Sequence, residues 1–271
     1  MIKVNGVELK NSRFPNGEIK LNEEQLQDML HIHGVEIEFY YTGDESIIEL
    51  IFVTKYFQEK TGACVIVNMM YMPYSRMDRE HDETTAFTLR YLCETLRGMN
   101  GDGKAEVHFN ILEPHSDVCT ALMKATKENI TEDMFLSLLE RGFVDVRTDI
   151  VFFPDAGAQK RYSDIRFRHL VGFKHRDWET GEIKSLEVCG EIPPKGFRVW
   201  ILDDLCSYGG SFYHSAKKLR ELGASEVYLI VTHCENTVLE GELINSGLID
   251  KIYTTNTIFT GQHERIEVKE F

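Results

Sequence analysis

Long hydrophobic runs are missing from this sequence of 271 residues. Its longest apolar stretches, at residues 65–72 and 227–231, have the length of β-strands, whereas a membrane-spanning helix needs roughly 18 apolar residues. The N-terminal segment also lacks the apolar core of about 7 to 15 residues that a secretory signal peptide carries. We therefore expect a soluble, cytoplasmic protein that has no membrane partner.

Positive charge is scarce as well. The chain holds 30 lysine and arginine residues against 44 aspartate and glutamate residues, which gives a formal net charge of −14. A field of this sign repels polyphosphate backbones, so it disfavours nucleic acid and anionic membranes as partners. An anionic small substrate would need local positive charge and a metal ion.

Cysteine pairs with metal-binding spacing are absent. None of the six cysteines forms a Cys-x-x-Cys pair or a zinc-site spacing, and several lie within apolar stretches. Such residues are typical of the interior of a reduced, cytosolic protein. We expect core thiols at Cys64, Cys93, Cys119, Cys189, Cys206 and Cys234.

Strand-like and helix-like segments alternate along the chain, which predicts the α/β class. The first βαβ unit has a strand at 35–41, a helix at 44–60 with apolar residues on much of its surface, and a strand at 64–71. Further strands are expected at 106–112, 149–153, 197–202 and 226–231, and further helices at 84–96, 134–141 and 212–222.

No low-complexity tract separates domains in this sequence. A polar stretch at 125–132, with a helix start signal at Thr131, is the best place for a compact boundary. The length fits about two domains. We therefore expect two α/β domains, 1–128 and 129–271, each with a mainly parallel sheet flanked by helices.

Three polar clusters follow predicted strands, at residues 72–79, 113–116 and 154–161. Ligands bind beyond the carboxyl ends of strands in open α/β sheets, so these clusters are candidate site segments. Any one of them alone is more often a charged turn.

The strongest cluster is at residues 199–214, where a strand is expected to end in Asp203 and Asp204 before a Gly-Gly-Ser sequence opens a helix. The glycines permit close backbone approach, and the free amides at a helix start can hold a phosphate. The two carboxylates could bind a ribose diol, or magnesium through water. The alternative is a tight turn with Ser211 as the helix N-cap.

Residues 203–211 read Asp-Asp-Leu-Cys-Ser-Tyr-Gly-Gly-Ser. This segment resembles the loop that binds phosphoribosyl diphosphate (PRPP) in type I phosphoribosyltransferase folds. The other clusters narrow the resemblance to ribose-phosphate pyrophosphokinases, over about residues 13–257. It implies two tandem type I phosphoribosyltransferase-like domains, an N-terminal ATP-side domain and a C-terminal ribose-phosphate-binding domain.

The resemblance also implies an ATP site. Residues 13–18 are similar to the family's loop that reaches ATP across a subunit interface, and residues 74–79 are similar to its ATP-binding segment. A homo-oligomer, either a dimer or a hexamer, is therefore expected. The residues that the resemblance assigns to ATP are Phe14, which would stack on adenine, and Asn16, Glu18, Arg76, Met77, Asp78 and His115.

The activity that the resemblance implies is transfer of the β,γ-diphosphate of ATP to the anomeric hydroxyl of a ribose 5-phosphate unit, with release of AMP. Mg²⁺ is the implied cofactor, with His115 and Asp155 near it. Lys174 and Arg176, in the segment where the family has a catalytic flexible loop, would join His115 as catalytic residues and cover the developing charge.

Two departures from the family pattern bear on the acceptor. Ser207 stands where the family has aspartate, and Tyr208 where it has threonine. A bulky aromatic residue in place of a phosphate-gripping hydroxyl could support a larger 5′ substituent by stacking. The acceptor is therefore either ribose 5-phosphate or a 5′-extended ribose phosphate such as ADP-ribose. The residues expected to bind it are Asp203, Asp204, Ser207, Tyr208, Gly209, Gly210 and Ser211.

Two other classes compete with this interpretation. A phosphoribosyltransferase would share the loop at 203–211 but would need no ATP-binding segments, and the clusters at 13–18 and 76–78 argue against it. A catalytically silent regulatory homologue is the non-enzyme alternative. The joint presence of the residues expected to act in catalysis argues against that reading.

Overall fold

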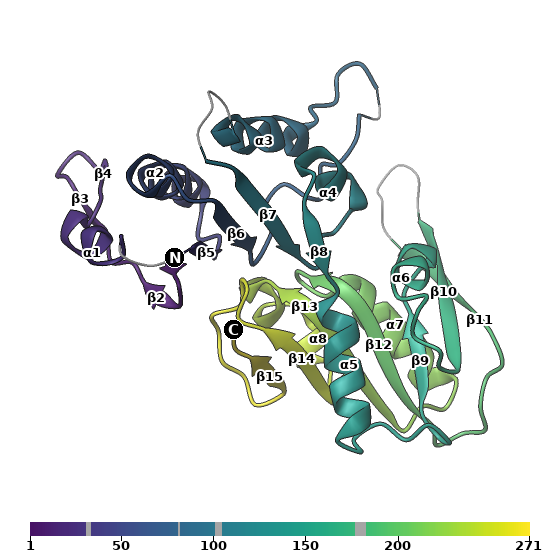
Figure 1. Ribbon diagram of the computed structural model, residues 1–271. Helices are drawn as coiled ribbons and strands as arrows, with labels where there is room; N and C mark the ends of the chain where they lie inside the picture. Colours follow the sequence, from purple (N-terminus) through teal and green to yellow (C-terminus); the bar gives the residue numbers. More distant parts are fainter. Residues whose placement is uncertain (31–33, 81, 101–104, 177–182) are drawn as a thin grey trace. The chain divides into compact units, whose positions relative to one another are not determined.

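The computed structural model describes residues 1–30, 34–80, 82–100, 105–176 and 183–271, with side chains described at all of these except 174–176 and 183–185 (Figure 1). These residues form two compact units, Met1–Glu128 and Asn129–Phe271. Each unit has its own sheet and its own hydrophobic core. The described residues include no helix that is long and apolar enough to cross a membrane.

The first unit is built on a six-stranded sheet in the order β2-β1-β5-β6-β7-β8. The strands from β5 to β8 are parallel, whereas β1 pairs antiparallel with both β2 and β5. The strands are β1 (Ile2–Val4), β2 (Val7–Glu8), β5 (Val35–Phe39), β6 (Val65–Met69), β7 (Val107–Leu112) and β8 (Thr126–Glu128). The helices are α1 (Glu23–Asp28), α2 (Asp44–Thr61), α3 (Thr88–Arg97), η1 (Gly98–Asn100) and α4 (Asp117–Met123).

Helix α2 shows how the sequence produces these elements. Its buried residues Leu50, Val53 and Phe57 recur at spacings of three and four, so they share one face and enter the core. The helix ends at Gly62, whose φ of 62° is the left-handed conformation that glycine adopts at little cost. A separate two-stranded hairpin, β3 (Ser12–Arg13) and β4 (Ile19–Lys20), lies outside the main sheet.

The second unit is built on a seven-stranded sheet in the order β11-β10-β9-β12-β13-β14-β15. All neighbouring strands pair in parallel except β10 and β11, which are antiparallel. The strands are β9 (Ile150–Phe153), β10 (His169–Arg176), β11 (Ile183–Cys189), β12 (Arg198–Cys206), β13 (Glu226–Cys234), β14 (Lys251–Thr255) and β15 (Ile266–Lys269). The helices are α5 (Ile130–Glu140), α6 (Ala156–Arg161), α7 (Gly210–Glu221), η2 (Asn236–Leu239) and α8 (Glu242–Asn245).

A buried carboxylate joins β12 to the loop before β9. The side chain of Asp149 has no exposed surface, and Arg198 contacts both of its oxygens, at 2.9 Å from Nε to Oδ1 and 2.8 Å from Nη2 to Oδ2. The indole nitrogen of Trp200 donates to Oδ2 at 2.9 Å, and its ring stacks on Tyr228 at 4.3 Å between centroids. Because Arg198 and Trp200 bond both oxygens of the Asp149 carboxylate, its negative charge can remain inside the core.

The predicted α/β class is confirmed, and the predicted strands and helices are present with shifted ends. One shift affects the site: β12 continues to Cys206, so Asp203 and Asp204 lie inside the strand rather than at its end. The physical reason is that parallel pairing with β13 persists to the pair Cys206 and Cys234. The sequence patterns did not predict the hairpin β10–β11, the strand β14 or the edge strand β15.

The expectation of a core position is wrong for two cysteines, and the alternative interpretation of Ser211 is wrong as well. Cys64 and Cys189 are exposed, whereas the other four cysteines are buried, and all six are free thiols. Ser211 is not the N-cap of α7; Gly209 takes that position with a φ of 81°. A left-handed cap residue suits glycine, and the serine therefore lies one residue inside the helix.

Candidate functional site

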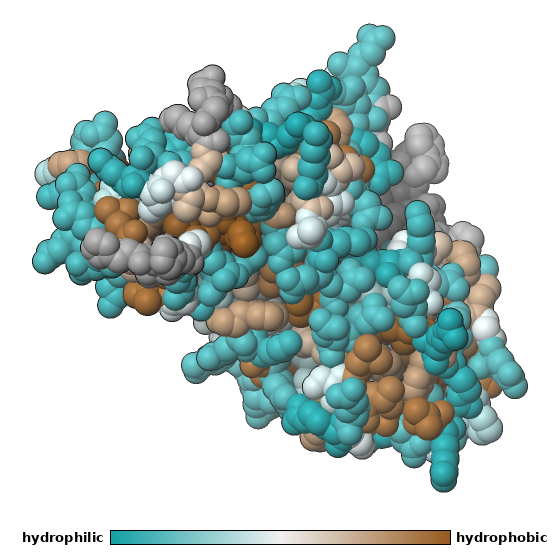
Figure 2. All heavy atoms as spheres, viewed as in Figure 1, coloured by the Kyte–Doolittle hydropathy of each residue, from teal (hydrophilic) through white to brown (hydrophobic). Residues whose placement is uncertain are grey.

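The polar clusters lie at the carboxyl ends of strands in both units. Residues 72–79 come after β6 and residues 113–116 connect β7 to α4, while Pro154 and Asp155 connect β9 to α6. Hydrophilic side chains cover much of the visible surface (Figure 2), in keeping with the excess of acidic residues. Each unit therefore presents its own group of candidate residues at the edge where open α/β sheets bind ligands.

In the first unit, Asp78 links two of these segments. Its carboxylate pairs with Arg79 at 2.8 Å from Oδ1 to Nε and also accepts a hydrogen bond from Ser116. These bonds, the Arg79 bond foremost, hold the pKa of Asp78 below its ordinary value, and the charge of His115 contributes. The side chains of Asp78 and His115 therefore lie near each other. Arg76 and Met77, which precede Asp78 in the chain, are exposed.

Tyr74 has a strained backbone at the start of this cluster. Its φ of 62° is left-handed, which is uncommon for a residue other than glycine. Its hydroxyl donates to Oδ1 of Asp44 at 2.6 Å, and the hydroxyl of Tyr41 donates to the same oxygen at 2.8 Å. Both bonds lower the pKa of Asp44. The bond to α2 thus fixes the segment that carries Arg76 and Asp78.

Phe14 lies at the tip of the hairpin β3–β4. Its backbone nitrogen donates to the carbonyl of Glu18 at 2.9 Å, and the side chain of Asn16 accepts from the nitrogen of Glu18 at 3.2 Å. The Phe14 ring is 47% exposed, with the ammonium of Lys20 at 5.7 Å from its centroid. Asn16 therefore stabilises the turn, and the aromatic ring remains accessible to a ligand or a partner.

In the second unit, carboxylates gather around the end of β12. Asp155 caps α6 by accepting from the backbone nitrogen of Ala158 at 3.0 Å. Asp204 pairs with Arg161 at 3.1 Å from Oδ2 to Nη1. Burial raises the pKa of Asp203 well above its ordinary value, and the charges of Asp204 and Asp155 add to the effect. The cluster thus holds three acidic side chains close together beside one arginine.

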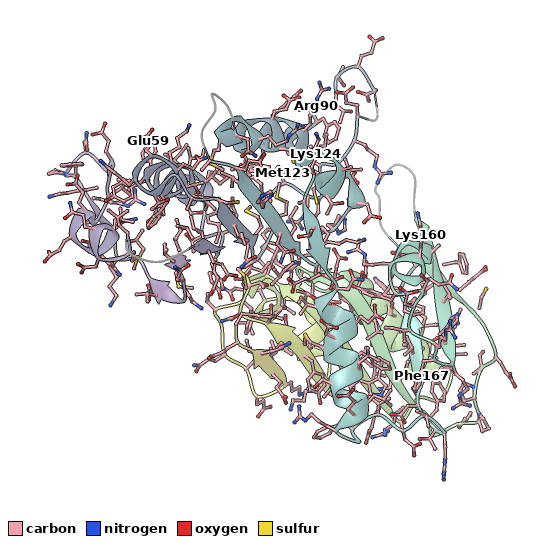
Figure 3. The ribbon with its side chains drawn as sticks, in the orientation of Figure 1. Glu59, Arg90, Met123, Lys124, Lys160 and Phe167 are labelled. Atoms are coloured by element: carbon pink, nitrogen blue, oxygen red, sulfur yellow. The ribbon has the colours of Figure 1, made fainter. Side chains whose placement is uncertain are left out.

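Helix α6 supplies the positive charge near this cluster. Lys160 and Arg161 occupy its last turn, and Figure 3 shows Lys160 on that helix. The sequence patterns gave no role to Arg161. Its position eight residues after the end of the strand 150–153 was the available signal, because that segment belongs to one of the three clusters.

The loop between β12 and α7 is held by the segment that follows β13. The hydroxyl of Ser207 donates to Oε2 of Glu235 at 2.5 Å, and the exposed Tyr208 presents 56% of its surface. A Cβ on Gly209 would come within 2.7 Å of Leu243, and one on Gly241 within 2.0 Å of the Tyr208 carbonyl oxygen. The glycines therefore allow close packing here, and Glu235 contacts the candidate loop at a position that sequence reasoning did not identify.

Lys174 and Arg176 occupy the end of β10 rather than a loop. Lys174 pairs with Leu186 and Arg176 with Ile183 of β11, with a register irregularity between His175 and Arg176. Their side chains are outside the described part of the structure. The expected catalytic segment is thus one arm of an antiparallel hairpin.

Magnesium was expected near His115 and Asp155, which belong to different units. Among the residues that the structure describes, no group of three or more His, Cys, Asp or Glu side chains is placed to hold a metal ion. Mg²⁺ commonly binds through one or two carboxylates together with substrate phosphates and water. The neighbouring carboxylates Asp155 and Asp203 fit that mode, and the imidazole of His115 fits contact with a phosphate better than contact with this oxygen-preferring ion.

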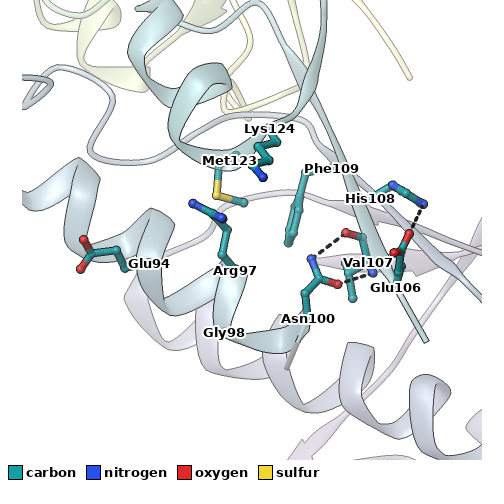
Figure 4. A pocket seen from close by; sticks show the side chains of 10 residues that line it. All are labelled: Glu94, Arg97, Gly98, Asn100, Glu106, Val107, His108, Phe109, Met123 and Lys124. Atoms are coloured by element: carbon teal, nitrogen blue, oxygen red, sulfur yellow. Dashed lines mark hydrogen bonds and ion pairs between the residues drawn. The ribbon is translucent and has the colours of Figure 1, made fainter. Parts of the chain in front are cut away.

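A cavity of about 630 Å³ in the first unit belongs to a different region. Figure 4 shows it between the C-terminal end of α3, with Arg97, and the first residues of β7, with Val107 and His108. The candidate residues of this unit instead follow the carboxyl ends of the strands. The cavity therefore contains none of them.

Comparison with known proteins identifies relatives along nearly the whole chain. Ribose-phosphate pyrophosphokinase of Sulfurisphaera tokodaii is 26% identical over 95% of this chain and 87% of its own, and that of Thermococcus kodakarensis is 27% identical over 95% and 88%. No protein-family model matches the chain. The crystal structure of phosphoribosylpyrophosphate synthetase from Mycobacterium smegmatis covers 97% of this chain and 86% of its own at a TM-score of 0.72 and 16% identity, which shows a shared fold. The resemblance to ribose-phosphate pyrophosphokinases is confirmed.

Proposed function

We propose that this protein transfers the β,γ-diphosphate of ATP to the anomeric hydroxyl of a ribose 5-phosphate unit and releases AMP. The observation that carries the proposal is the end of β12, where Asp203 and Asp204 precede a left-handed glycine cap at the start of α7. This arrangement offers carboxylates to a sugar diol and helix amides to a phosphate. It lies in a chain that relatives named ribose-phosphate pyrophosphokinase match over 95% of its length.

The reaction is an in-line displacement. The anomeric oxygen forms a bond to the β-phosphorus of ATP as the bond from that phosphorus to the α,β-bridging oxygen breaks, the hydroxyl proton is released, and AMP leaves. Asp203 and Asp204 accept hydrogen bonds from the ribose hydroxyls, with Arg161 holding Asp204 in place. Positioning and charge neutralisation supply most of the catalysis in such transfers.

The remaining residues act on the nucleotide. His115 contacts the triphosphate beside Asp78, and the exposed Arg76 adds positive charge. Lys174 and Arg176 supply cations to the charge that develops on the transferred group. Asp155 and Asp203 would hold Mg²⁺ together with the substrate phosphates, and the ion would supply charge neutralisation and polarisation at the reacting phosphorus. The exposed ring of Phe14 supports stacking on adenine in a neighbouring subunit's site, so we propose a homo-oligomer, at least a dimer.

The acceptor proposed is a 5′-extended ribose phosphate such as ADP-ribose, which would give its 1-diphosphate. Support comes from Tyr208, which is more than half exposed where a small hydroxyl residue would grip a terminal phosphate. An exposed aromatic ring next to the loop can stack on a second ring carried by the acceptor. Ribose 5-phosphate is the competing acceptor, and the product would then be PRPP.

The test measures AMP release from ATP and Mg²⁺ with ribose 5-phosphate and with ADP-ribose in parallel, with products identified by mass. Higher kcat/KM for ADP-ribose supports the extended acceptor, and higher kcat/KM for ribose 5-phosphate shows that Tyr208 is tolerated in a PRPP synthetase. No AMP with either acceptor, together with retained nucleotide binding, shows a catalytically silent protein and contradicts the proposal.

Variants separate catalysis from folding in the same assay. Lys174→Ala and Asp204→Ala should each lower kcat/KM by about 100-fold or more, since both remove charge interactions with the reacting groups. Lys217→Ala removes an exposed lysine on α7 and serves as the matched control, which should keep wild-type activity. Equal activity of all three variants would contradict the assigned roles.

A further inference from the structure

One carboxylate at the start of α2 binds two tyrosine hydroxyls. The hydroxyl of Tyr74 donates to Oδ1 of Asp44 at 2.6 Å, and that of Tyr41 donates to the same oxygen at 2.8 Å. Asp44 is the first residue of this 18-residue helix, where the helix dipole favours a negative charge. Both tyrosines therefore donate to a charged acceptor, which gives a stronger bond than a neutral one.

Helix α2 gives this carboxylate a firm base. Leu50, Val53 and Phe57 have no exposed surface and belong to the core of the first unit. Because protein interiors are close-packed, a helix whose face is buried in this way cannot shift without losing contacts. A side chain that is bonded to Asp44 is therefore tied to the core of the unit.

Tyr74 belongs to the turn that leads to Asp78. Its φ of 62° is left-handed, a conformation that costs free energy in residues other than glycine and persists only where the surroundings maintain it. The backbone nitrogen of Met77 closes the turn by donating to the Tyr74 carbonyl at 2.8 Å. Since Tyr74 is 38% exposed, the bond from its hydroxyl to Asp44, rather than burial of its ring, opposes relaxation of the turn.

The same segment carries residues proposed to act on ATP. Arg76 lies two residues after Tyr74 and is exposed. Asp78 follows, bonded to Arg79 and to Ser116. A change of φ at Tyr74 alters the direction of the chain that comes after it, so Arg76 is the first of these residues to leave its position.

We propose, on the basis of the function proposed above, that Asp44 and Tyr74 are positioning residues for ATP. Asp44 holds the hydroxyl of Tyr74, this bond keeps the turn in its left-handed conformation, and the turn presents Arg76 and Asp78 to the triphosphate. Neither member of the pair touches the nucleotide in this role. The pair should act on the affinity for ATP and not on that for the acceptor, whose proposed binding residues belong to the second unit.

The first test is Tyr74→Phe, which keeps the ring but removes the hydroxyl. We expect the KM for ATP to rise about tenfold, as expected on loss of a hydrogen bond to a charged group, while kcat and the KM for the acceptor change by less than about twofold. The matched control is Tyr41→Phe, which removes a bond to the same oxygen but lies outside the turn. Its KM for ATP should stay at the wild-type value.

Stability measurements separate positioning from folding. Each phenylalanine variant loses one hydrogen bond to the same carboxylate, so urea unfolding should show losses of similar size in the two. A merely structural bond would also give them the same KM for ATP. Asp44→Ala should raise this KM as Tyr74→Phe does, and Asp44→Asn, which keeps an oxygen that can accept from Tyr74, should restore most of the loss.

A binding measurement keeps the inference testable without turnover. The dissociation constant of ATP with Mg²⁺, measured by calorimetry without acceptor, should rise about tenfold in Tyr74→Phe and stay at the wild-type value in Tyr41→Phe. An unchanged KM and an unchanged affinity in Tyr74→Phe overturn the positioning role, even if the wild-type protein is active. An equal rise in Tyr41→Phe overturns it as well.

The two proposals fail in different ways. Absence of AMP with both acceptors in a wild-type protein that binds ATP overturns the proposed function and leaves the ATP titration to decide the role of Asp44 and Tyr74. A wild-type protein that does not bind ATP overturns both.

Discussion

Gly241 allows the loop that carries Tyr208 to pack closely against the segment after β13. Its φ of −76° is available to any residue, so the constraint comes from space alone: a Cβ would stand 2.0 Å from the carbonyl oxygen of Tyr208. No real contact of this kind is that short, so a side chain here must push the loop away from its support. Backbone atoms cannot move aside as a flexible side chain can.

Gly241→Ala should therefore weaken acceptor binding and destabilise the second unit by about 1 to 3 kcal/mol, the usual cost of overpacking. Urea unfolding and acceptor titration measure the two effects. Gly98→Ala is the control, because a Cβ there meets no atom within 4 Å and its φ of −59° is helical. Equal stability of both variants would show that the loop can move without cost.

The six thiols should divide into two reactive and four unreactive residues. Cys64 and Cys189 are exposed, whereas the others are buried. Burial raises the pKa of Cys93 to about 12, so this thiol stays protonated, and hence weakly nucleophilic, throughout the working range of a thiol reagent. An Ellman-type assay at pH 8 should titrate two thiols in the native protein and six in denaturant, and raising the pH to 9 should speed the first two without adding a third.

At the scale of elements, helix α5 is joined to the sheet by a buried hydroxyl. Thr131 donates to the carbonyl of Asp203 at 2.9 Å and accepts from the backbone nitrogen of Thr232 at 3.1 Å. One side chain therefore connects α5 to both β12 and β13. It also fixes the backbone of the first acidic residue in the candidate site.

Thr131→Val replaces the hydroxyl with a methyl group and leaves the Thr232 nitrogen without this partner. Loss of a buried hydrogen-bond partner costs about 1 to 3 kcal/mol, and denaturant unfolding should show a loss of that size. Thr131→Ser keeps the hydroxyl, so it should recover most of the difference. A valine variant as stable as the serine variant would show that the hydroxyl contributes nothing net.

Sequence patterns predicted the central elements better than their ends. Helix α2 and strands β5, β6 and β7 were recoverable because their buried residues follow one period throughout. The end of β12 could not be predicted in this way. Two adjacent acidic residues favour a turn when only local sequence is considered, but the pairing of β12 with β13 continues past them. The hairpin β10–β11 was missed for a related reason: its antiparallel partner is a long-range contact that no local pattern encodes.

The candidate site was predictable where residues are close in sequence and not where they meet through folding. The segments 72–79, 113–116 and 203–211 could be identified from their own composition. Glu235 and Arg161 join the candidate site only through contacts with Ser207 and Asp204, at sequence separations of 28 and 43 residues. Their roles depend on strand order, which the sequence alone did not provide.

At the scale of the whole molecule, each unit has its own core, so a core mutation in one unit should destabilise that unit and leave the other unchanged. Asp149 is completely buried and belongs to the second unit, where it accepts from Arg198 and Trp200. Asp149→Asn should destabilise that unit by about 3 kcal/mol, because it breaks the ion pair between this buried carboxylate and Arg198.

Hydrogen exchange should therefore quicken in β9, β12 and β13 and remain unchanged in β5, β6 and β7. Glu226→Gln is the matched control: Glu226 lies 4.0 Å from the same arginine, but its side chain is 42% exposed. An exposed pair contributes at most about 1 kcal/mol. Equal quickening in both sheets would show that the two cores unfold as one.

The stacked indole of Trp200 makes the second unit optically distinct. Both tryptophans of the chain, Trp178 and Trp200, fall in Asn129–Phe271, and Met1–Glu128 contains none. Light absorbed at the red edge of the aromatic band, where tyrosine is transparent, therefore excites the second unit alone. With Trp200 only 1% exposed, its emission should lie to the blue of free indole, so the chain carries an intrinsic chromophore that reports on the second unit without any label.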